Sequence, residues 1–417
     1  MSLSKKNLFF LILIVAAICF SPRFSVGHIG RRSIDIRIED ILCVVLGIEW
    51  LLSFLVSNST KVRKPPLFLP IFCWVSIGFI STSINLILGN VTLPRSFFYF
   101  LKEIEYFFLY FYVFYHIKSA YSIISVIKSW FIFGAINVVW IILQLMGIVK
   151  GGEYGYRYSG AYLVGAIGEK GPFPSGGFFL MLVSNLLSFL FFYKSFSKKW
   201  KVFGGLVVFG LFLGIFGTMR RSVMVGLIVA LFVIVVIYIL RAKRRKVLLN
   251  SLAFLSLVIF ISFLFFKTAP LRPGVFNSQR IIWELNERIG IWVNQIKTAF
   301  QDSFYIFLGQ GKSVLLTTEE SHSGYVRNLV ETGVVGFFAF LFLMYIILKK
   351  SIQNFFYRED PLVVSLSASL FVSTIALLVI AIPAEGFTVV RINEVYWFFA
   401  GLTMAVMSLK TKEDYGE

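Results

Sequence analysis

The chain has 417 residues, of which 58% are hydrophobic and only 15% charged, and its mean hydropathy is +0.83. This composition excludes an ordinary soluble protein, because apolar runs of about 20 residues recur along the chain, as in helices that cross a bilayer. The net charge of +19 does not indicate a nucleic-acid partner. Much of it lies in short loops between apolar runs, as is typical of the cytoplasmic face of membrane proteins.

Twelve apolar segments are predicted to cross the membrane as helices. The N-terminal run is interpreted as the first of them rather than as a signal peptide, because it lacks an A-x-A cleavage site. The sequence therefore predicts an all-α polytopic integral membrane protein with about 12 transmembrane helices, in which residues 1–417 form a single membrane domain. The predicted spans are 7–21, 39–57, 67–87, 96–117, 121–149, 175–193, 202–217, 221–240, 248–267, 325–348, 362–383 and 394–410.

Basic residues in alternate loops predict the orientation of these spans. Lys5 and Lys6 precede the first span, and basic runs on the same side follow at 61–64, 194–201, 241–246 and 349–358. The positive-inside rule places this side, both termini and the tail 410–417 in the cytoplasm. The large loop 268–324 then lies on the outer side, and the helical spacing of its apolar residues predicts short amphipathic helices across the outer mouth.

Arginines on the predicted outer side exceed what the topology needs. The guanidinium fork matches phosphate oxygens, so the surplus favours an anionic ligand at the outer surface. The alternative is that these arginines pair with Asp35, Glu284, Glu287 and Glu394 or with lipid headgroups. The arginines concerned are Arg23, Arg31, Arg32, Arg157, Arg221, Arg272, Arg280, Arg288 and Arg391.

His322 precedes the tenth predicted span. An imidazole with a pKa near 6.5 can accept a proton from an attacking hydroxyl at neutral pH, and nearby arginines can stabilise a leaving diphosphate as its charge develops. A structural alternative is open at this point, in which His322 caps the tenth span by bonding a free backbone group.

Ionisable residues also lie inside the fourth predicted span. Lys102 and Glu105 are three residues apart on one helical face, so they can pair with each other, and Glu103 lies between them. Such groups are costly within a membrane and usually face a cavity or a partner. Both a structural ion pair and a role in substrate binding are open, and Glu49 and Lys128 are similar cases.

Motifs for metal or nucleotide chemistry are missing from the sequence. Neither D-x-D nor H-E-x-x-H occurs and there are only five aspartates, so metal-independent chemistry without a cofactor is expected. The run "GQGKS" (309–313) resembles the end of a P-loop, but Ile306 stands where the first glycine is required. We interpret these glycines as a tight turn. The three cysteines all lie in apolar runs and are interpreted as buried packing residues.

Several segments, taken in order, resemble the O-antigen ligase/O-antigen polymerase family of bacterial polysaccharide assembly. The segment "FGTMRRSVMVGLIVAL" (216–231) is similar to the family's T-x-S-R-[SG] at the outer start of a span, and "ERIGIWVNQI" (287–296) to its R-x-x-x-W. The segment "LGQG" (308–311) is similar to its G-x-G, and "HSGYVRNLVETGVVG" (322–336) to its histidine followed by E-x-G-x-x-G. The resemblance extends over most of the chain.

The resemblance implies a GT-C-type membrane glycosyltransferase of the bacterial inner membrane. Its members transfer an oligosaccharide from undecaprenyl diphosphate to a sugar hydroxyl on the periplasmic face, with inversion and without a metal. By matching position, Arg221 and Arg288 would bind the diphosphate and His322 would activate or orient the acceptor hydroxyl. Arg220 stands where the family often has serine, so Arg220 and Arg221 could exchange roles.

Further candidate substrate-binding residues are Arg157, Arg280, Lys102 and Glu105. Arg157 lies ten intervening residues before Gly168, the spacing found in polymerase loops and repeated from His322 to Gly333. Arg280 also precedes a tryptophan, but by three residues, and it competes less well than Arg288, which precedes Trp292 by four.

The acceptor distinguishes the two activities of the family. A polymerase extends another lipid-linked repeat of O-antigen or exopolysaccharide and is the favoured reading, whereas a ligase transfers the glycan to lipid A-core. The expected partners are the lipid-linked donor, the acceptor glycan, membrane lipids and a chain-length regulator. A transporter or flippase is disfavoured by the large outer loop and by the lack of a visible inverted repeat. A peptidoglycan polymerase would be expected to use an aspartate in the loop, where only Asp302 occurs.

Overall fold

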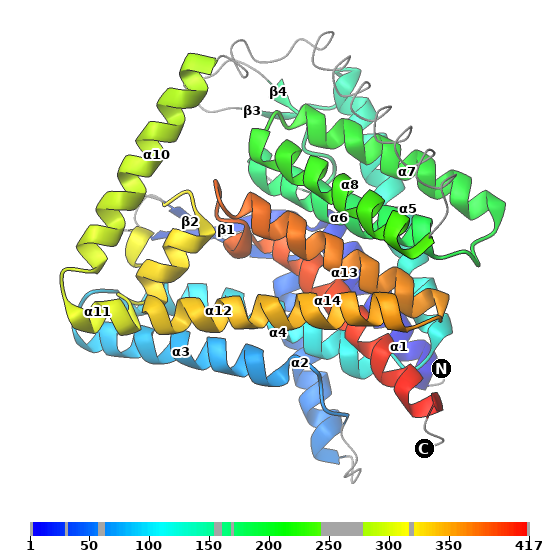
Figure 1. Cartoon of the computed structure of the whole chain (residues 1–417), viewed down its shortest axis with the longest axis horizontal. Coiled ribbons are helices and arrows are strands. Elements are labelled where there is room, and N and C mark those ends of the chain that lie inside the picture. The colour runs from blue at the N-terminus through cyan, green and yellow to red at the C-terminus, as the bar shows by residue number, and fades with distance from the viewer. Residues whose placement is uncertain are drawn as a thin grey trace.

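A computed structural model of the chain describes residues 3–29, 32–56, 63–153, 161–167, 171–242, 278–316 and 321–414. Helices dominate these residues and form a bundle, shown in Figure 1. The helices are α1 (Leu3–Phe20), α2 (Ile38–Val56), α3 (Phe68–Ile87), α4 (Leu93–His116), α5 (Ala120–Leu145), α6 (Pro172–Phe192), α7 (Lys198–Gly217), α8 (Arg221–Ala242), α10 (Ser278–Ala299), α11 (Ser303–Leu308), α12 (Gly324–Tyr357), α13 (Pro361–Ile380) and α14 (Val390–Asp414). Short 3-10 helices lie at η1 (Val314–Leu316) and η2 (Gly386–Thr388).

Eight of the described helices are long and apolar enough to cross a membrane: α3, α5, α6, α7, α8, α12, α13 and α14. They coincide with eight of the predicted spans, so the prediction of a helical, multi-pass membrane protein is confirmed. The helices α1, α2 and α4 coincide with three more predicted spans but are not among the eight. Charged side chains interrupt α4, and the predicted span 248–267 lies outside the described residues. A total of twelve spans therefore stays a prediction.

Helix α13 lies at the centre of the bundle, in contact with α6, α8 and α12, while α14 packs against α4 and α6. Small residues let these helices approach closely. A Cβ atom added to Gly177 of α6 would lie 2.1 Å from the side chain of Ile392, and one on Gly226 of α8 would lie 2.4 Å from Ile380. The Ser369 hydroxyl also donates to the Asn185 carbonyl across the α13–α6 contact (2.9 Å).

Two short hairpins correct the prediction that the chain is all-α. Strands β1 (Arg23–Ile29) and β2 (Arg32–Arg37) pair antiparallel between α1 and α2, and β3 (Gly152–Glu153) pairs with β4 (Ala161–Tyr162) between α5 and α6. Hairpin pairing satisfies the backbone hydrogen-bonding groups of these segments, which are too short and too polar to continue as apolar helices. The strict alternation of polar and apolar residues from Ser33 to Ile38 is a signal that favours β2, whereas β3 and β4 are too short to show a pattern.

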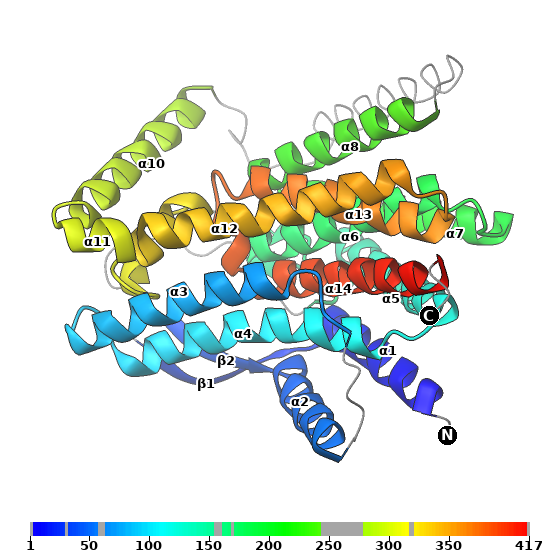
Figure 2. The same ribbon diagram turned by 60° about the horizontal axis from the view of Figure 1, so that its bottom comes forward.

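The two ends of the bundle differ in character. Both termini lie at one end, and α10 and α11 lie at the other, as both Figure 1 and Figure 2 show. The loop 268–324 was predicted to contain amphipathic helices, and α10 and α11 confirm this for its described residues. The large loop that carries several candidate site residues therefore lies at the end of the bundle opposite the termini.

Candidate functional site

The start of α8 carries two of the candidate arginines. Helix α7 ends at Gly217, and a tight turn follows in which Met219 has a φ of 54°. Gly217 is required there, because a Cβ atom would lie 2.1 Å from the side chain of Leu163. The turn places Arg220 just before α8 and Arg221 at its first residue.

Helix α10 brings a third arginine to the same place. Arg221 forms an ion pair with Glu284 of α10. One turn later, Arg288 donates to the Pro383 carbonyl in the loop between α13 and α14 (2.7 Å). Burial lowers the pKa of the Arg288 guanidinium; Glu284 raises it, and the positive charges of Arg220 and Arg221 lower it further. The three arginines therefore act on one another electrostatically and form one group, which we call the arginine cluster (Arg220, Arg221 and Arg288).

The segment that carries His322 is held by the next turn of α10. The indole N–H of Trp292 donates to the Ser321 carbonyl (2.6 Å). His322 follows with an exposed side chain and a φ of 51°, a left-handed conformation that costs energy in a residue other than glycine. The N-cap residue of α12 is Ser323, whose side chain accepts from the Val326 N–H. Ser323, and not His322, therefore fills the N-cap position of α12.

A buried ion network lies close to His322, in the first turns of α12. Arg327 pairs with Glu331 (3.1 Å) and with Glu385, and its guanidinium lies over the ring of Tyr99 (5.4 Å). The Ser321 hydroxyl donates to the second oxygen of Glu385 (2.9 Å). The turn before α12 is thus tied through Glu385 to the loop between α13 and α14.

That loop also holds Arg288, through Pro383, so it joins the arginine cluster to the His322 segment. The N–H of Gly324, the first residue of α12, reinforces the join by donating to the carbonyls of Ala381 (2.8 Å) and Ala384 (3.1 Å). Three connections therefore lead from this one loop to the segments that carry Arg288 and His322.

The run 309–313 forms the tight turn expected from its glycines. Gly309 has a φ of 72° and Gly311 a φ of 86°. The backbone N–H groups of residues 310 to 313 donate in turn to Val330 O, Glu331 O, Thr82 Oγ1 and Glu331 Oε1. They are used within the protein, so this turn does not resemble a P-loop, whose N–H groups face phosphate.

Lys102 and Glu105 lie in a different network from the arginine cluster. Lys102 pairs with Glu105 (3.0 Å), as their spacing predicted, and also with Asp40 of α2. Neighbouring Glu103 pairs with Lys312 (3.3 Å). The structural alternative is thus realised for Lys102, which lies between two carboxylates.

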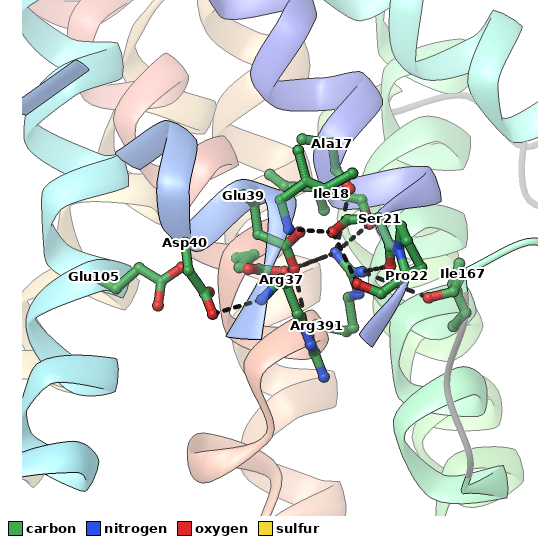
Figure 3. Close-up of polar contacts among 12 residues, drawn as sticks. Ala17, Ile18, Ser21, Pro22, Arg37, Glu39, Asp40, Glu105, Ile167 and Arg391 are labelled. Carbon is green, nitrogen blue, oxygen red and sulfur yellow. Dashed lines mark hydrogen bonds and ion pairs between the residues drawn. The ribbon is translucent and has the colours of Figure 1, made fainter. Parts of the chain in front are cut away.

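Arg391 corrects one part of the prediction about outer arginines. Its side chain is fully buried at the start of α14 and pairs with Glu39 (2.8 Å) and Glu394 (3.4 Å). Figure 3 shows that it also donates to carbonyls at the end of α1, namely Ile18 (2.7 Å) and Ser21 (2.6 Å). The Arg391 guanidinium is therefore bonded to groups inside the protein and does not face an outer ligand.

One group of carboxylates has the spacing of metal ligands among the described residues. Oxygens of Glu39, Asp40 and Glu394 lie within 4.8 Å of one another. Each of the three also has a cationic partner: Arg37 and Arg391 for Glu39, Arg391 for Glu394, and Lys102 for Asp40. Because every carboxylate of the group already pairs with a cation, the group is better described as an internal ion network.

Six of the outer arginines lie beyond what the structure describes. Arg31, Arg157 and Arg272 lie outside the described residues, and the side chains of Arg23, Arg32 and Arg280 are not described. Glu49 and Lys128 have local partners: Glu49 pairs with Lys6 (3.0 Å), and the Lys128 ammonium lies over the ring of Trp200 (5.1 Å). The cysteines carry no disulfide; Cys19 and Cys43 are buried as predicted, whereas Cys73 is only half-buried.

Comparison with known proteins identifies no family for this chain. A scan against protein-family models gives no match, and neither does a search of curated proteins. The resemblance to the O-antigen ligase/O-antigen polymerase family therefore rests on the residues quoted above, and function has to be argued from the site.

Proposed function

We propose that the chain is a membrane glycosyltransferase that transfers an oligosaccharide from undecaprenyl diphosphate to a sugar hydroxyl, with inversion and without a metal. The reaction would take place at the end of the bundle that carries α10, on the periplasmic face of the inner membrane, with both termini in the cytoplasm. A GT-C-type fold with twelve spans belongs to the same proposal.

The observation that carries the proposal is the arginine cluster. Arg220, Arg221 and Arg288 come from two helices and act on one another, while the acidic residues that act on Arg288 are Glu284 and Glu287. Three positive and two negative groups leave the cluster with one net positive charge. Arginines are well suited to bind diphosphate oxygens, and a bound diphosphate would replace Glu284 as the partner of Arg221.

His322 supplies the second element of the proposed mechanism. Its side chain is exposed beside a segment that Trp292 ties to the helix of Arg288. In the proposed step the acceptor oxygen bonds to the anomeric carbon on the side opposite the diphosphate. The bond from that carbon to the diphosphate oxygen breaks, and its electron pair leaves with the diphosphate, which the arginines hold. The hydroxyl proton passes to a ring nitrogen of His322.

Polymerisation of O-antigen or exopolysaccharide repeats is the activity we favour, with another lipid-linked repeat as acceptor and a chain-length regulator as partner. Transfer to lipid A-core is the second form of the same chemistry. Gel analysis of a strain lacking the gene separates the two. Single-repeat glycan on the core indicates a missing polymerase, whereas accumulation of long lipid-linked chains indicates a missing ligase.

The test of the mechanism is complementation of that strain with His322→Ala and Arg288→Ala. Lys199→Ala is the matched control, because Lys199 is an exposed cation at the opposite end of α7 from the Arg220–Arg221 turn. We expect both site variants to lose long-chain polysaccharide at a normal protein level in the membrane, while the control restores it. Full-length glycan from both site variants would refute the mechanism.

A further inference from the structure

Helix α10 is tied by one face to the ends of three membrane-spanning helices. Glu284 pairs with Arg221, the first residue of α8, and Trp292 donates to Ser321, three residues before α12 begins. Between them, Arg288 donates to Pro383, three residues after α13 ends. The residues 284, 288 and 292 are four apart and therefore share one face of the helix. Because spanning helices end near the membrane surface, these three ties hold α10 at that level.

The C-terminal half of α10 packs on α12 through the same face. Ala299 belongs to a small buried cluster with Val326 and Val330 of α12, and Trp292 and Ile296 pack against it. The inward face of α10 is thus occupied along its length by ion pairs, hydrogen bonds and apolar contacts. What remains is the part of its surface that does not face the bundle.

The free surface of α10 divides into an apolar and a polar stripe. Ile282, Leu285, Ile289 and Val293 follow one another at helical spacing beside the inward face, and their exposed fractions are 57%, 50%, 43% and 45%. We call these four residues the apolar stripe. Exposed Asn294, Lys297 and Thr298 lie on the other side of the helix, where the indole of Trp283 is also exposed (63%).

We propose that α10 is an interfacial membrane helix whose apolar stripe inserts into the lipid leaflet at the end of the bundle opposite the termini. Helices with an apolar face and a polar face lie in the plane of the interface, with the apolar face about 5–10 Å into the boundary between headgroups and acyl chains. The partner is lipid hydrocarbon, because the stripe lies at the level where three spanning helices end and its four side chains carry no polar group.

This arrangement has a consequence for the arginine cluster. Arg288 lies on the face adjacent to the apolar stripe, so insertion of the stripe would hold its guanidinium at the depth of lipid phosphate groups. A lipid-borne diphosphate could then reach the cluster without leaving the bilayer. This consequence rests on the proposed function, whereas the insertion of α10 does not.

Nitroxide labels test the insertion in the full chain reconstituted into phosphatidylethanolamine–phosphatidylglycerol vesicles. One label is placed at Leu285→Cys, Ile289→Cys or Val293→Cys, and in matched controls at Asn294→Cys, Lys297→Cys or Thr298→Cys. All six positions are exposed, so the substitutions leave the core intact. Cys19 and Cys43 are buried and Cys73 is half-buried, so the signal of the labelled wild-type chain is subtracted. Collisions with molecular oxygen report lipid, and collisions with a water-soluble nickel complex report water.

We expect a ratio of oxygen to nickel collisions that is several-fold higher at the three stripe positions than at the three controls. Equal ratios in both sets would overturn the proposal, because the stripe would then face water. Low collision rates with both reagents at the stripe would also overturn it, because another protein segment would then cover the stripe. Loss of glycan synthesis in the His322 variant has no bearing on these ratios, so this proposal and the proposed function can fail separately.

Discussion

Arg327 is a cation buried between two carboxylates, and its replacement by alanine should destabilise the chain strongly. Its side chain is 4% exposed and pairs with Glu331 and Glu385. Removing one partner of a buried ion pair costs about 3–5 kcal/mol, because the remaining charges are left uncompensated. In the variant, Glu331 still accepts a hydrogen bond from the Ser313 N–H (3.0 Å) and Glu385 one from the Ser321 hydroxyl (2.9 Å). We therefore expect a loss of stability near the lower limit, about 3 kcal/mol.

The free energy of unfolding is measured by titrating mixed micelles with SDS and following tryptophan fluorescence. The control is Lys6→Ala, which breaks a pair with Glu49 in which the side chains are 48% and 35% exposed. Exposed pairs contribute about 0–1 kcal/mol. The triple variant Arg327→Met/Glu331→Gln/Glu385→Gln should recover most of the lost stability, because no charge remains buried. If Arg327→Ala lowered the free energy of unfolding no more than Lys6→Ala does, the buried network would not stabilise the chain as proposed.

Three further predictions use the same titration. Gly333→Ala should destabilise the chain by more than the cost of a strained backbone alone, which is about 1–3 kcal/mol. Gly333 has a φ of 66°, and a Cβ atom there would also lie 2.3 Å from the Phe307 carbonyl oxygen. The control Gly205→Ala should be neutral or stabilising, because a Cβ atom at Gly205 would have no atom within 4 Å. Lys102→Met should destabilise the chain by about 3–5 kcal/mol, because Asp40 and Glu105 lose their cationic partner. The double variant Lys102→Met/Asp40→Asn should regain part of this stability. An unchanged unfolding midpoint for Lys102→Met, together with weaker binding of the donor, would instead support a substrate-binding role. Trp292→Phe should cost about 1 kcal/mol and speed amide hydrogen exchange in residues 321–324, and unchanged exchange there would contradict the tie to α10.

The spans were predictable because each is a long apolar run, and eight of them coincide with described helices that are long and apolar enough to cross a membrane. The ion pair of Lys102 with Glu105 was also predictable, because residues three apart on a helix are neighbours whatever surrounds them. The turn at "GQGKS" followed from glycines, which accept unusual backbone angles. These features depend on local sequence alone.

Other features depend on contacts between distant segments. Arg391 was counted among the outer arginines because nothing near it in the sequence reveals that the end of α1 and Glu39 surround it. The pair of Arg327 with Glu331 is visible as a spacing of four, but the role of Glu385 is not, because it lies 58 residues away from Arg327. The hairpin between α1 and α2 is a different case, because the alternation of polar and apolar residues from Ser33 to Ile38 is visible in the sequence and favours a strand.

The central claim is that Arg221 and Arg288 bind a lipid diphosphate together. Its most direct test is the affinity of the chain in nanodiscs for undecaprenyl diphosphate, measured by native mass spectrometry for the wild type, Arg221→Ala, Arg288→Ala and the control Lys199→Ala. Hydrogen bonds to charged groups contribute about 1.5–3 kcal/mol, so each site variant should bind roughly ten- to a hundredfold more weakly, with the control unchanged. Equal affinity in all four proteins would contradict the account.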